Sequence, residues 1–148
     1  MFEIESHVNS MNLNYSKSYI KEILKEVSTI AVVGASANKE KDSFKVMQSL
    51  VENDYKVFPV NPYEAGNLIL GQRCYKDLKS IDEKIDMVDI FRAADAIIGI
   101  TKQSIEIKAK VLWTQLGIIN TEAADLAEKA GLKVVMNRCP KIELENAH

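Results

Sequence analysis

Short apolar runs alternate along the chain with segments in which apolar residues recur at helical spacing. The runs are rich in β-branched residues and nearly continuous, which is typical of strands that a parallel sheet buries on both faces. There are five such runs: TIAVV at 29–33, YKVFPVNP at 55–62, IDMVDIF at 85–91, KVLWTQLG at 110–117 and LKVVM at 132–136. We expect the fourth strand to end near Trp113.

Four helices are expected before and between these strands, over residues 16–27, 43–53, 95–107 and 120–131. Ser16 or Ser18 can cap the first helix, and Asn53 can end the second in the left-handed conformation. The last helix carries the clearest signals, because Asn120 is a favourable N-cap and Gly131 is a favourable stop.

This alternation of strands and helices predicts an α/β fold. Right-handed crossovers favour a Rossmann-like, doubly wound parallel sheet of five strands in the order 3-2-1-4-5, preceded by an N-terminal helix. That amphipathic helix can cover the sheet or join two copies in a homodimer. Residues 1–14 are polar and are expected to form a flexible arm, which leaves residues 15–148 as a single domain with a loosely packed polar tail, 137–148.

Composition narrows the classes of partner and compartment. The 148 residues suit one compact domain, and a formal net charge of −2 offers no basic face for nucleic acid. No run of about 18 apolar residues is present, so no membrane span is expected, and the N-terminus lacks the basic start and apolar stretch of a secretory signal. Cys74 and Cys139 lie far apart without metal-like spacing, which favours a reduced, cytoplasmic protein.

In an open α/β sheet, a ligand binds beyond the C-terminal ends of the strands, where the strand order reverses. In the expected order this switch point lies between the first and fourth strands. Turns of small or polar residues follow four of the strands, and we expect them to form one crevice. The turns are Gly34 to Ser43, Asn61-Pro62, Phe91-Arg92 and Gln115-Leu116-Gly117.

The turn after the first strand, GASANKEKDS, lacks the marks of three common sites. A dinucleotide site needs further glycines and an acidic residue after the second strand, where this chain has Asn61-Pro62. A P-loop needs a second glycine before its lysine, and a nucleophile elbow needs a glycine two residues after its serine, so Ser36 is not expected to be a nucleophile. What remains is a phosphate held by backbone N–H groups and by the start of the next helix.

Side chains near this turn add little net charge. Lys39, Lys41 and Lys45 are cationic, but Glu40 and Asp42 offset two of them. Ser43 can cap the helix or contact a phosphate, and capping is the simpler interpretation. Arg92, after the third strand, either supplies positive charge to the crevice or is a solvated surface residue.

The residues offer no catalytic constellation and no metal site. The two histidines, His7 and His148, lie near the two ends of the chain. Asp86 and Asp89 are three residues apart on a strand and point to opposite faces, so we interpret them as boundary or turn residues rather than a catalytic pair.

Five stretches occur in order along the chain: VVGAS, VNP, VDIFR, LWTQLG and MNRCPKIE. As an ordered set they resemble the small single-domain CoA-binding proteins, which are similar to the N-terminal CoA-binding domain of the succinyl-CoA synthetase α subunit. The resemblance covers about residues 18–143. It implies a Rossmann-like CoA-binding domain over residues 15–148, with coenzyme A lying across the switch point.

The resemblance also implies which residues contact coenzyme A. The turn after the first strand, with Lys39 and Ser43 nearby, would approach the phosphates, and Asn61-Pro62 would line the adenine–ribose side. Trp113, among the residues that flank the rest of the ligand, has an alternative interpretation as a core aromatic. The implied set has no catalytic or metal-binding member and consists of Gly34, Ala35, Ser36, Lys39, Ser43, Asn61, Pro62, Phe91, Arg92, Trp113, Gln115, Leu116 and Gly117.

Three functions are compatible with this resemblance. The first is a non-catalytic or accessory protein that binds coenzyme A or an acyl-CoA, because succinyl-CoA synthetase transfers phosphate through a histidine and this chain has no interior histidine. The second is a subunit or partner of an acyl-CoA ligase-type enzyme. The third is a redox-linked regulator in which Cys139 forms a mixed disulfide with coenzyme A, although a buried structural cysteine is the commoner case.

Overall fold

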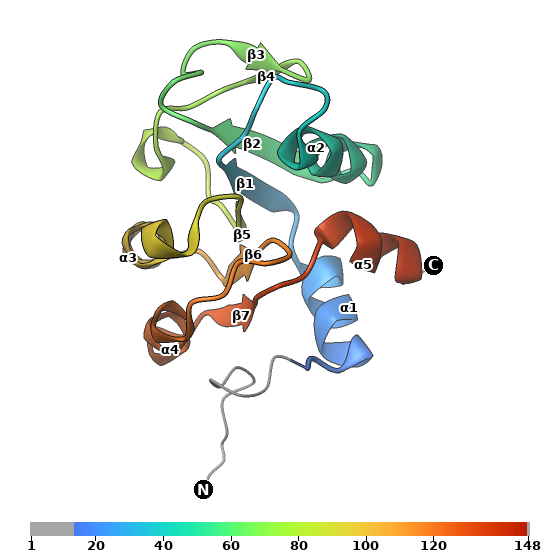
Figure 1. The fold of residues 1–148 in the computed structure, drawn as a ribbon, viewed down its shortest axis with the longest axis vertical. Coiled ribbons are helices and arrows are strands. Elements are labelled where there is room, and N and C mark those ends of the chain that lie inside the picture. The colour runs from blue at the N-terminus through green and yellow to red at the C-terminus, as the bar shows by residue number, and fades with distance from the viewer. Residues whose placement is uncertain (1–13, 148) are drawn as a thin grey trace, which may run out of the picture.

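A computed structural model describes residues 14–147, so residues 1–13 of the expected arm and His148 lie outside the described residues. Its centre is a parallel sheet of five strands in the order β2-β1-β5-β6-β7 (Figure 1). The five predicted strands are thereby confirmed. They are β1 (Thr29–Val33), β2 (Lys56–Val60), β5 (Met87–Ile90), β6 (Val111–Thr114) and β7 (Lys133–Val135).

The doubly wound arrangement is confirmed, with one strand in a different place. A one-residue parallel bridge at Tyr75 lies outside β2, and it is this bridge that takes the third place in the 3-2-1-4-5 order. The sequence had given that place to β5, which instead pairs with β1 on its other side. Pro59 explains the short bridge, because a proline on the outer edge of β2 has no N–H for a longer ladder. The switch point therefore lies between β1 and β5.

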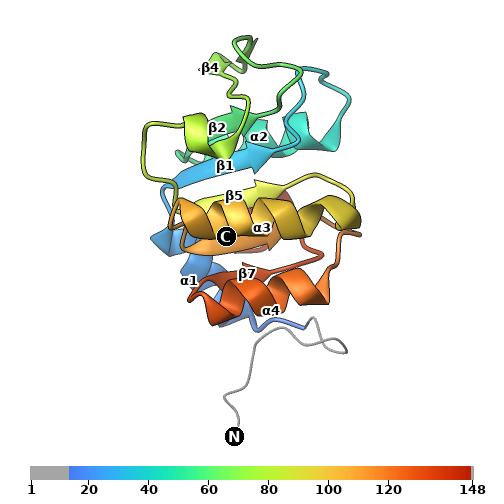
Figure 2. The ribbon, with the colours of Figure 1, turned by 90° about the vertical axis from the view of Figure 1, so that its left-hand side faces the viewer.

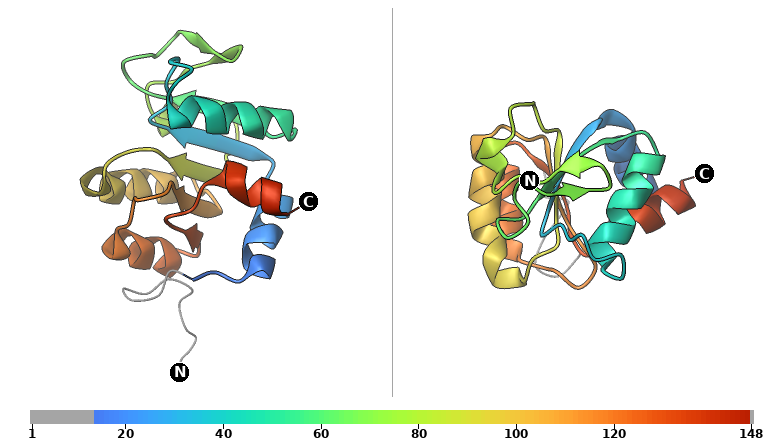
Figure 3. Two further views of the ribbon diagram at one scale, coloured as in Figure 1. Left: turned by 45° about the vertical axis from the view of Figure 1, so that its right-hand side comes forward. Right: turned by 90° about the horizontal axis from the view of Figure 1, so that it is seen from above.

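Helices cover both faces of the sheet (Figures 2 and 3). α3 (Ile97–Glu106) and α4 (Thr121–Lys129) cover one face, where they pack against alternate strand residues such as Val33 and Ile90. α1 (Lys17–Glu26), α2 (Asp42–Glu52) and α5 (Pro140–Asn146) cover the other. The five strands of this sheet are consequently buried on both faces over most of their length, as the continuous apolar runs predicted.

The helix signals are largely confirmed. Ser16 caps α1, since its side chain accepts a hydrogen bond from Tyr19 N, and Asn120 caps α4 through Ala123 N. The end of α2 differs from the expectation. Asn53 has a φ of −96°, and the next residue, Asp54, takes the left-handed conformation with a φ of 70°.

The polar tail does not pack loosely, and that expectation is wrong. Proline at the first turn of α5 suits a helix start, and Leu144 and Cys139 are both buried against the sheet. The long connection after β2 also contains elements that the sequence did not predict. They are the hairpin of β3 (Leu68–Ile69) and β4 (Gln72–Arg73) and a 3-10 turn, η1 (Leu78–Ser80); a second turn, η2 (Ala94–Ala96), precedes α3.

Two tyrosines before and within α1 cover the outer edge of β7. Tyr15 Oη accepts a hydrogen bond from Met136 N at 2.8 Å. Tyr19 Oη donates to Val134 O at 2.9 Å and accepts from Val134 N at 3.0 Å. α1 thus covers the sheet and occupies edge groups that could otherwise pair with another strand. None of the helices in residues 14–147 has the length and apolar character needed to cross a membrane.

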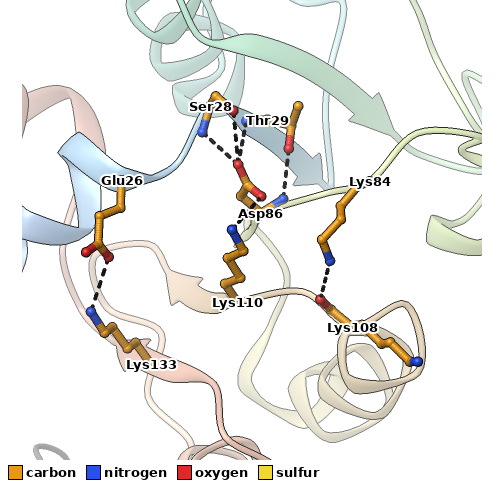
Figure 4. A network of polar contacts seen from close by, with 8 residues as sticks. All are labelled: Glu26, Ser28, Thr29, Lys84, Asp86, Lys108, Lys110 and Lys133. Atoms are coloured by element: carbon orange, nitrogen blue, oxygen red, sulfur yellow. Dashed lines mark hydrogen bonds and ion pairs between the residues drawn. The ribbon is translucent and has the colours of Figure 1, made fainter.

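Asp86 ties together the N-terminal ends of neighbouring strands (Figure 4). Its Oδ2 accepts hydrogen bonds from Ser28 N at 2.9 Å, Ser28 Oγ at 3.1 Å and Thr29 N at 3.4 Å. Lys110 Nζ lies 3.7 Å from the other carboxylate oxygen. Burial raises the pKa of Asp86, but these hydrogen bonds and the Lys110 charge together bring the pKa below its ordinary value.

Asp86→Ala is expected to lower the free energy of unfolding by about 2 kcal/mol at pH 7, because it leaves the Ser28 and Thr29 donors without their acceptor. A lowered folded pKa means that the contribution is present above the unfolded pKa and is lost as the pH falls through the folded pKa. The stability difference between wild type and Asp86→Ala is therefore expected to shrink as the pH falls, and urea unfolding of both proteins between pH 7 and pH 3 measures it. Asp82→Ala, at an exposed aspartate, is the control. A difference that is absent at pH 7 would contradict the role given to Asp86.

Candidate functional site

A pocket of about 460 Å³ lies at the C-terminal ends of β1, β2 and β5. It therefore occupies the switch point, which is the ligand position expected for an open α/β sheet. Its walls come from the ends of these strands, from the segment after the Tyr75 bridge and from α3. The lining residues are Val33, Gly34, Val60, Asn61, Pro62, Tyr63, Lys76, Asp77, Leu78, Phe91, Arg92, Ile100 and Gln103.

Five of the predicted contact residues line this pocket: Gly34, Asn61, Pro62, Phe91 and Arg92. Asn61 joins two of the turns, because its Nδ2 donates to Ala35 O at 2.8 Å and its Oδ1 accepts from Tyr63 N at 2.9 Å. The turns after β1, β2 and β5 thus form one crevice. The fourth turn that was expected in it, Gln115-Leu116-Gly117, does not line the pocket.

Position 34 requires glycine because the backbone there lies against the turn after β5. It has a φ of +89°, and a Cβ placed on it would lie 2.4 Å from Phe91 O and 3.2 Å from Arg92 Cδ. The backbone N–H groups of Gly34 and Ala35 both donate to Val60 O, at 2.9 and 3.2 Å. These two N–H groups already have an acceptor within the protein, which disfavours them as the phosphate donors expected from the sequence.

The rest of this turn is held by its own side chains. Ser36 Oγ accepts from Asn38 N at 3.0 Å, and Asn38 Oδ1 accepts from Glu40 N at 2.9 Å. Lys39 is exposed and does not line the pocket. Ser43 is not the cap of α2, because Lys41 occupies that position without a side-chain hydrogen bond and Ser43 is buried in the first turn.

Trp113 is a core aromatic rather than a ligand contact. Its side chain is fully buried, and its Nε1 donates to Arg138 O at 2.9 Å. The turn after β6 reaches the same edge of the sheet but lies outside the pocket. There Gln115 is buried, Leu116 is half-exposed, and Gly117 N donates to Asn137 Oδ1 at 2.7 Å.

Several residues of the pocket were not predicted from the sequence, among them Tyr63, Lys76, Ile100 and Gln103. Tyr63 directly follows Asn61-Pro62, so its position was the one available signal. Lys76 reaches the pocket through the Tyr75 bridge, and Ile100 and Gln103 reach it through α3. Neither placement follows from local sequence pattern, because both depend on how distant segments pack.

Asp86, which directly precedes β5, and Asp89, which lies within β5, have separate roles. Asp86 accepts hydrogen bonds from Ser28 and Thr29 at the N-terminal end of β1. Asp89 lies inside the strand, so its interpretation as a boundary or turn residue is wrong. It is fully buried, neither carboxyl oxygen has a hydrogen-bond partner among the described residues, and burial raises its pKa well above the ordinary value.

The cysteines are also buried. Cys139 belongs to the apolar cluster under α2 and α5 and is 6% exposed, which disfavours the mixed disulfide with coenzyme A. Burial raises the pKa of the Cys74 thiol. Across residues 14–147, no group of three or more His, Cys, Asp or Glu side chains is placed to hold a metal ion.

The chain is similar to known proteins over most of its length. The family model described as a CoA binding domain matches residues 28–145. The protein YneT of Bacillus subtilis is 36% identical over 129 residues, which are 87% of this chain and 94% of YneT. A structure from Pyrococcus horikoshii has a TM-score of 0.85 with 38% identity, over 95% of this chain and 99% of that one.

A more limited similarity links the chain to an enzyme. The α subunit of the ADP-forming acetate–CoA ligase I of Pyrococcus furiosus is 37% identical over 71 residues. These are 47% of this chain but only 15% of that subunit. The fold, the switch-point pocket and the family match agree, and the chain belongs to the CoA-binding domain family.

Proposed function

We propose that this protein binds coenzyme A or an acyl-CoA in the switch-point pocket, as a non-catalytic or accessory protein. The observation that carries the proposal is the convergence of Gly34, Asn61, Pro62, Phe91 and Arg92 on one cavity in a chain of the CoA-binding domain family. Arg92 is exposed at its rim, and its Cδ lies close to Gly34 at the end of β1. A guanidinium there suits the coenzyme diphosphate, which it can bind through paired hydrogen bonds.

Calorimetry with coenzyme A is expected to give saturable binding that Arg92→Gln weakens by roughly ten- to a hundredfold, as for a lost charge-assisted contact. Arg73→Gln removes the same charge from an exposed arginine outside this pocket and is expected to leave the affinity unchanged. Wild-type protein that binds no coenzyme A at low salt would overturn the proposal.

A second candidate is a partner of an acyl-CoA ligase-type enzyme, which the similarity to the acetate–CoA ligase α subunit favours. The matched residues are only 15% of that subunit, so the activity of the whole enzyme is tested rather than assumed for this chain. Thioester formation from acetate, ATP and coenzyme A that requires both this protein and a ligase subunit would support this candidate over the first.

A further inference from the structure

A small groove lies between α1 and α5, which pack side by side on one face of the sheet (Figures 1 and 3). Its volume is about 180 Å³, which is below the range of roughly 300–1,000 Å³ that is typical of small-molecule sites. A groove of this size suits an apolar side chain of a peptide rather than a cofactor. The lining residues are Lys17, Ile20, Lys21, Glu143, Asn146 and Ala147.

Within residues 14–147, the two lysines on the α1 side of this groove have no ion-pair partner. Lys17 and Lys21 are both exposed, and neither forms a salt bridge. The acids of α1 are engaged elsewhere, because Glu22 and Glu26 lie 3.6 and 3.3 Å from Lys133 Nζ. The two lysines also outnumber the single glutamate among the described lining residues. The charge of the groove therefore favours an acidic occupant.

The segment that precedes α1 has the complementary pattern. The stretch FEIE at 2–5 alternates apolar and acidic residues, and in an extended conformation successive side chains point to opposite sides. Glu3 and Glu5 would then lie about 6.6 Å apart, at about 3.3 Å per residue. Lys17 and Lys21 are four residues apart on a helix, which separates their Cβ atoms by about 5–6 Å. The two pairs of opposite charges therefore have matching spacing.

The intervening chain is long enough for this segment to reach the groove. Tyr15 is held against β7, because its Oη accepts a hydrogen bond from Met136 N at 2.8 Å, and Ser16 then caps α1. Lys21 lies about 8 Å along the helix axis from this cap. Residues 5–15 can span up to about 33 Å, so no strain opposes the return. A short tether also gives an effective concentration of about millimolar, so that weak contacts suffice.

We propose that residues 2–5 of this chain dock in the groove between α1 and α5 of the same molecule. Ile4 enters the groove over Ile20, and the acids on either side of Ile4 pair with the two lysines of α1. The lysine side chains are long enough to reach acids on the outer side of the segment while their stems line the groove. The groove shares no lining residue with the switch-point pocket, so the docking and the proposed function are tested separately.

Carbodiimide cross-linking of the full chain tests the docking, because the reagent joins a carboxylate to an amine that is in contact with it. Peptide mass spectrometry is expected to find one of the two acids joined to Lys17 or Lys21 within a single molecule. Mixing unlabelled and isotope-labelled protein identifies links between molecules. Ile4→Ser is expected to reduce the yield at least about threefold, because it removes the apolar contact and keeps both acids. Val8→Ser, in the same segment outside the docked stretch, is the matched control and should leave the yield unchanged.

The reactivity of the lysine amines gives a second measurement. In wild-type protein, Lys17 and Lys21 are expected to be acetylated about two- to fivefold more slowly than Lys25, as for amines in exposed ion pairs. Lys25 is an exposed lysine of α1 outside the groove, so it is a control within the same molecule. In the double variant Glu3→Gln/Glu5→Gln, the three lysines are expected to react alike.

Three results would overturn the inference. Links found mainly between molecules would show that the segment docks on a second copy instead. A yield that Ile4→Ser leaves unchanged would show that chance encounters, rather than docking, bring the charges together. Equal reactivity of the three lysines in wild-type protein would show that the ion pairs do not form.

Discussion

Gly34→Ala is expected to lower the free energy of unfolding by about 3 kcal/mol or more. The added Cβ would lie 2.4 Å from Phe91 O, and a backbone carbonyl in a paired strand end cannot move aside as a flexible side chain can. Overpacking of this kind costs about 1–3 kcal/mol, and the left-handed conformation adds about 1–2 kcal/mol for a residue with a Cβ. Urea unfolding followed by circular dichroism measures the loss.

Gly131→Ala is the matched control, because Gly131 has a φ of +93° and no atom within 4 Å of its added Cβ. It carries the conformational cost alone, so its expected loss is about 1 kcal/mol. The difference between the two variants then measures the contact with Phe91. Equal losses in both would contradict the steric role of Gly34.

A substitution at Gly34 that weakens coenzyme A binding would act first through the fold. Gly34 was expected to let a phosphate approach the backbone, yet its N–H donates to Val60 O and its α-carbon faces the turn after β5. A glycine followed by small residues identifies a place where backbone comes close to something, but the pattern does not identify the neighbour. Here the neighbour is the protein itself, so a bulky residue at Gly34 would damage the fold before it blocked a ligand.

The strands and the best-capped helices could be predicted because their signals are local. A continuous apolar run such as TIAVV specifies burial on both faces, and Asn120 needs only its own turn to cap α4. The tail was misjudged because α5 has few apolar positions, although its Pro140 and Leu144 are buried. Its proline at the first turn was the signal that could have indicated a helix.

The strand order and half of the site depend on contacts that no local pattern records. One hydrogen-bonded residue, Tyr75, occupies the third place in the sheet, and this moves β5 beside β1. Phe91-Arg92 consequently lie at the switch point, while the turn that contains Gln115 lies one strand farther away. Five residues of three turns could be placed at one site because strand ends share one edge whichever order the strands take; they are Gly34, Asn61, Pro62, Phe91 and Arg92.

Asp89 is an ionisable side chain in a fully buried position, where its carboxyl group has no hydrogen-bond partner among the described residues. By register it lies beside Val32 on β1 and Trp113 on β6, and both neighbours are fully buried apolar side chains. A carboxylate in such surroundings has lost its hydration without gaining a partner, so burial raises its pKa and favours the protonated acid. An acid that folds in its protonated form makes stability depend on pH.

The sign of this dependence is opposite to that for Asp86. Because the folded pKa of Asp89 is above the unfolded one, its contribution is fully present below the unfolded pKa, about 3.9, and is lost as the pH rises toward the folded pKa. The unfolded chain releases this proton first, and each further rise in pH favours unfolding. Replacing the carboxyl group by an amide of the same shape removes the titration without opening a cavity.

Asp89→Asn is therefore expected to be more stable than wild type by roughly 2 kcal/mol at pH 8, the cost of a buried ionisable group without a partner, and no more stable near pH 4. Urea unfolding of the two proteins at intervals between these values measures the divergence. Asp125→Asn, at an exposed aspartate on α4, is expected to follow wild type throughout. A stability difference between Asp89→Asn and wild type that stays constant with pH would show that Asp89 keeps the same charge in the folded and unfolded chains, which its complete burial among apolar side chains argues against.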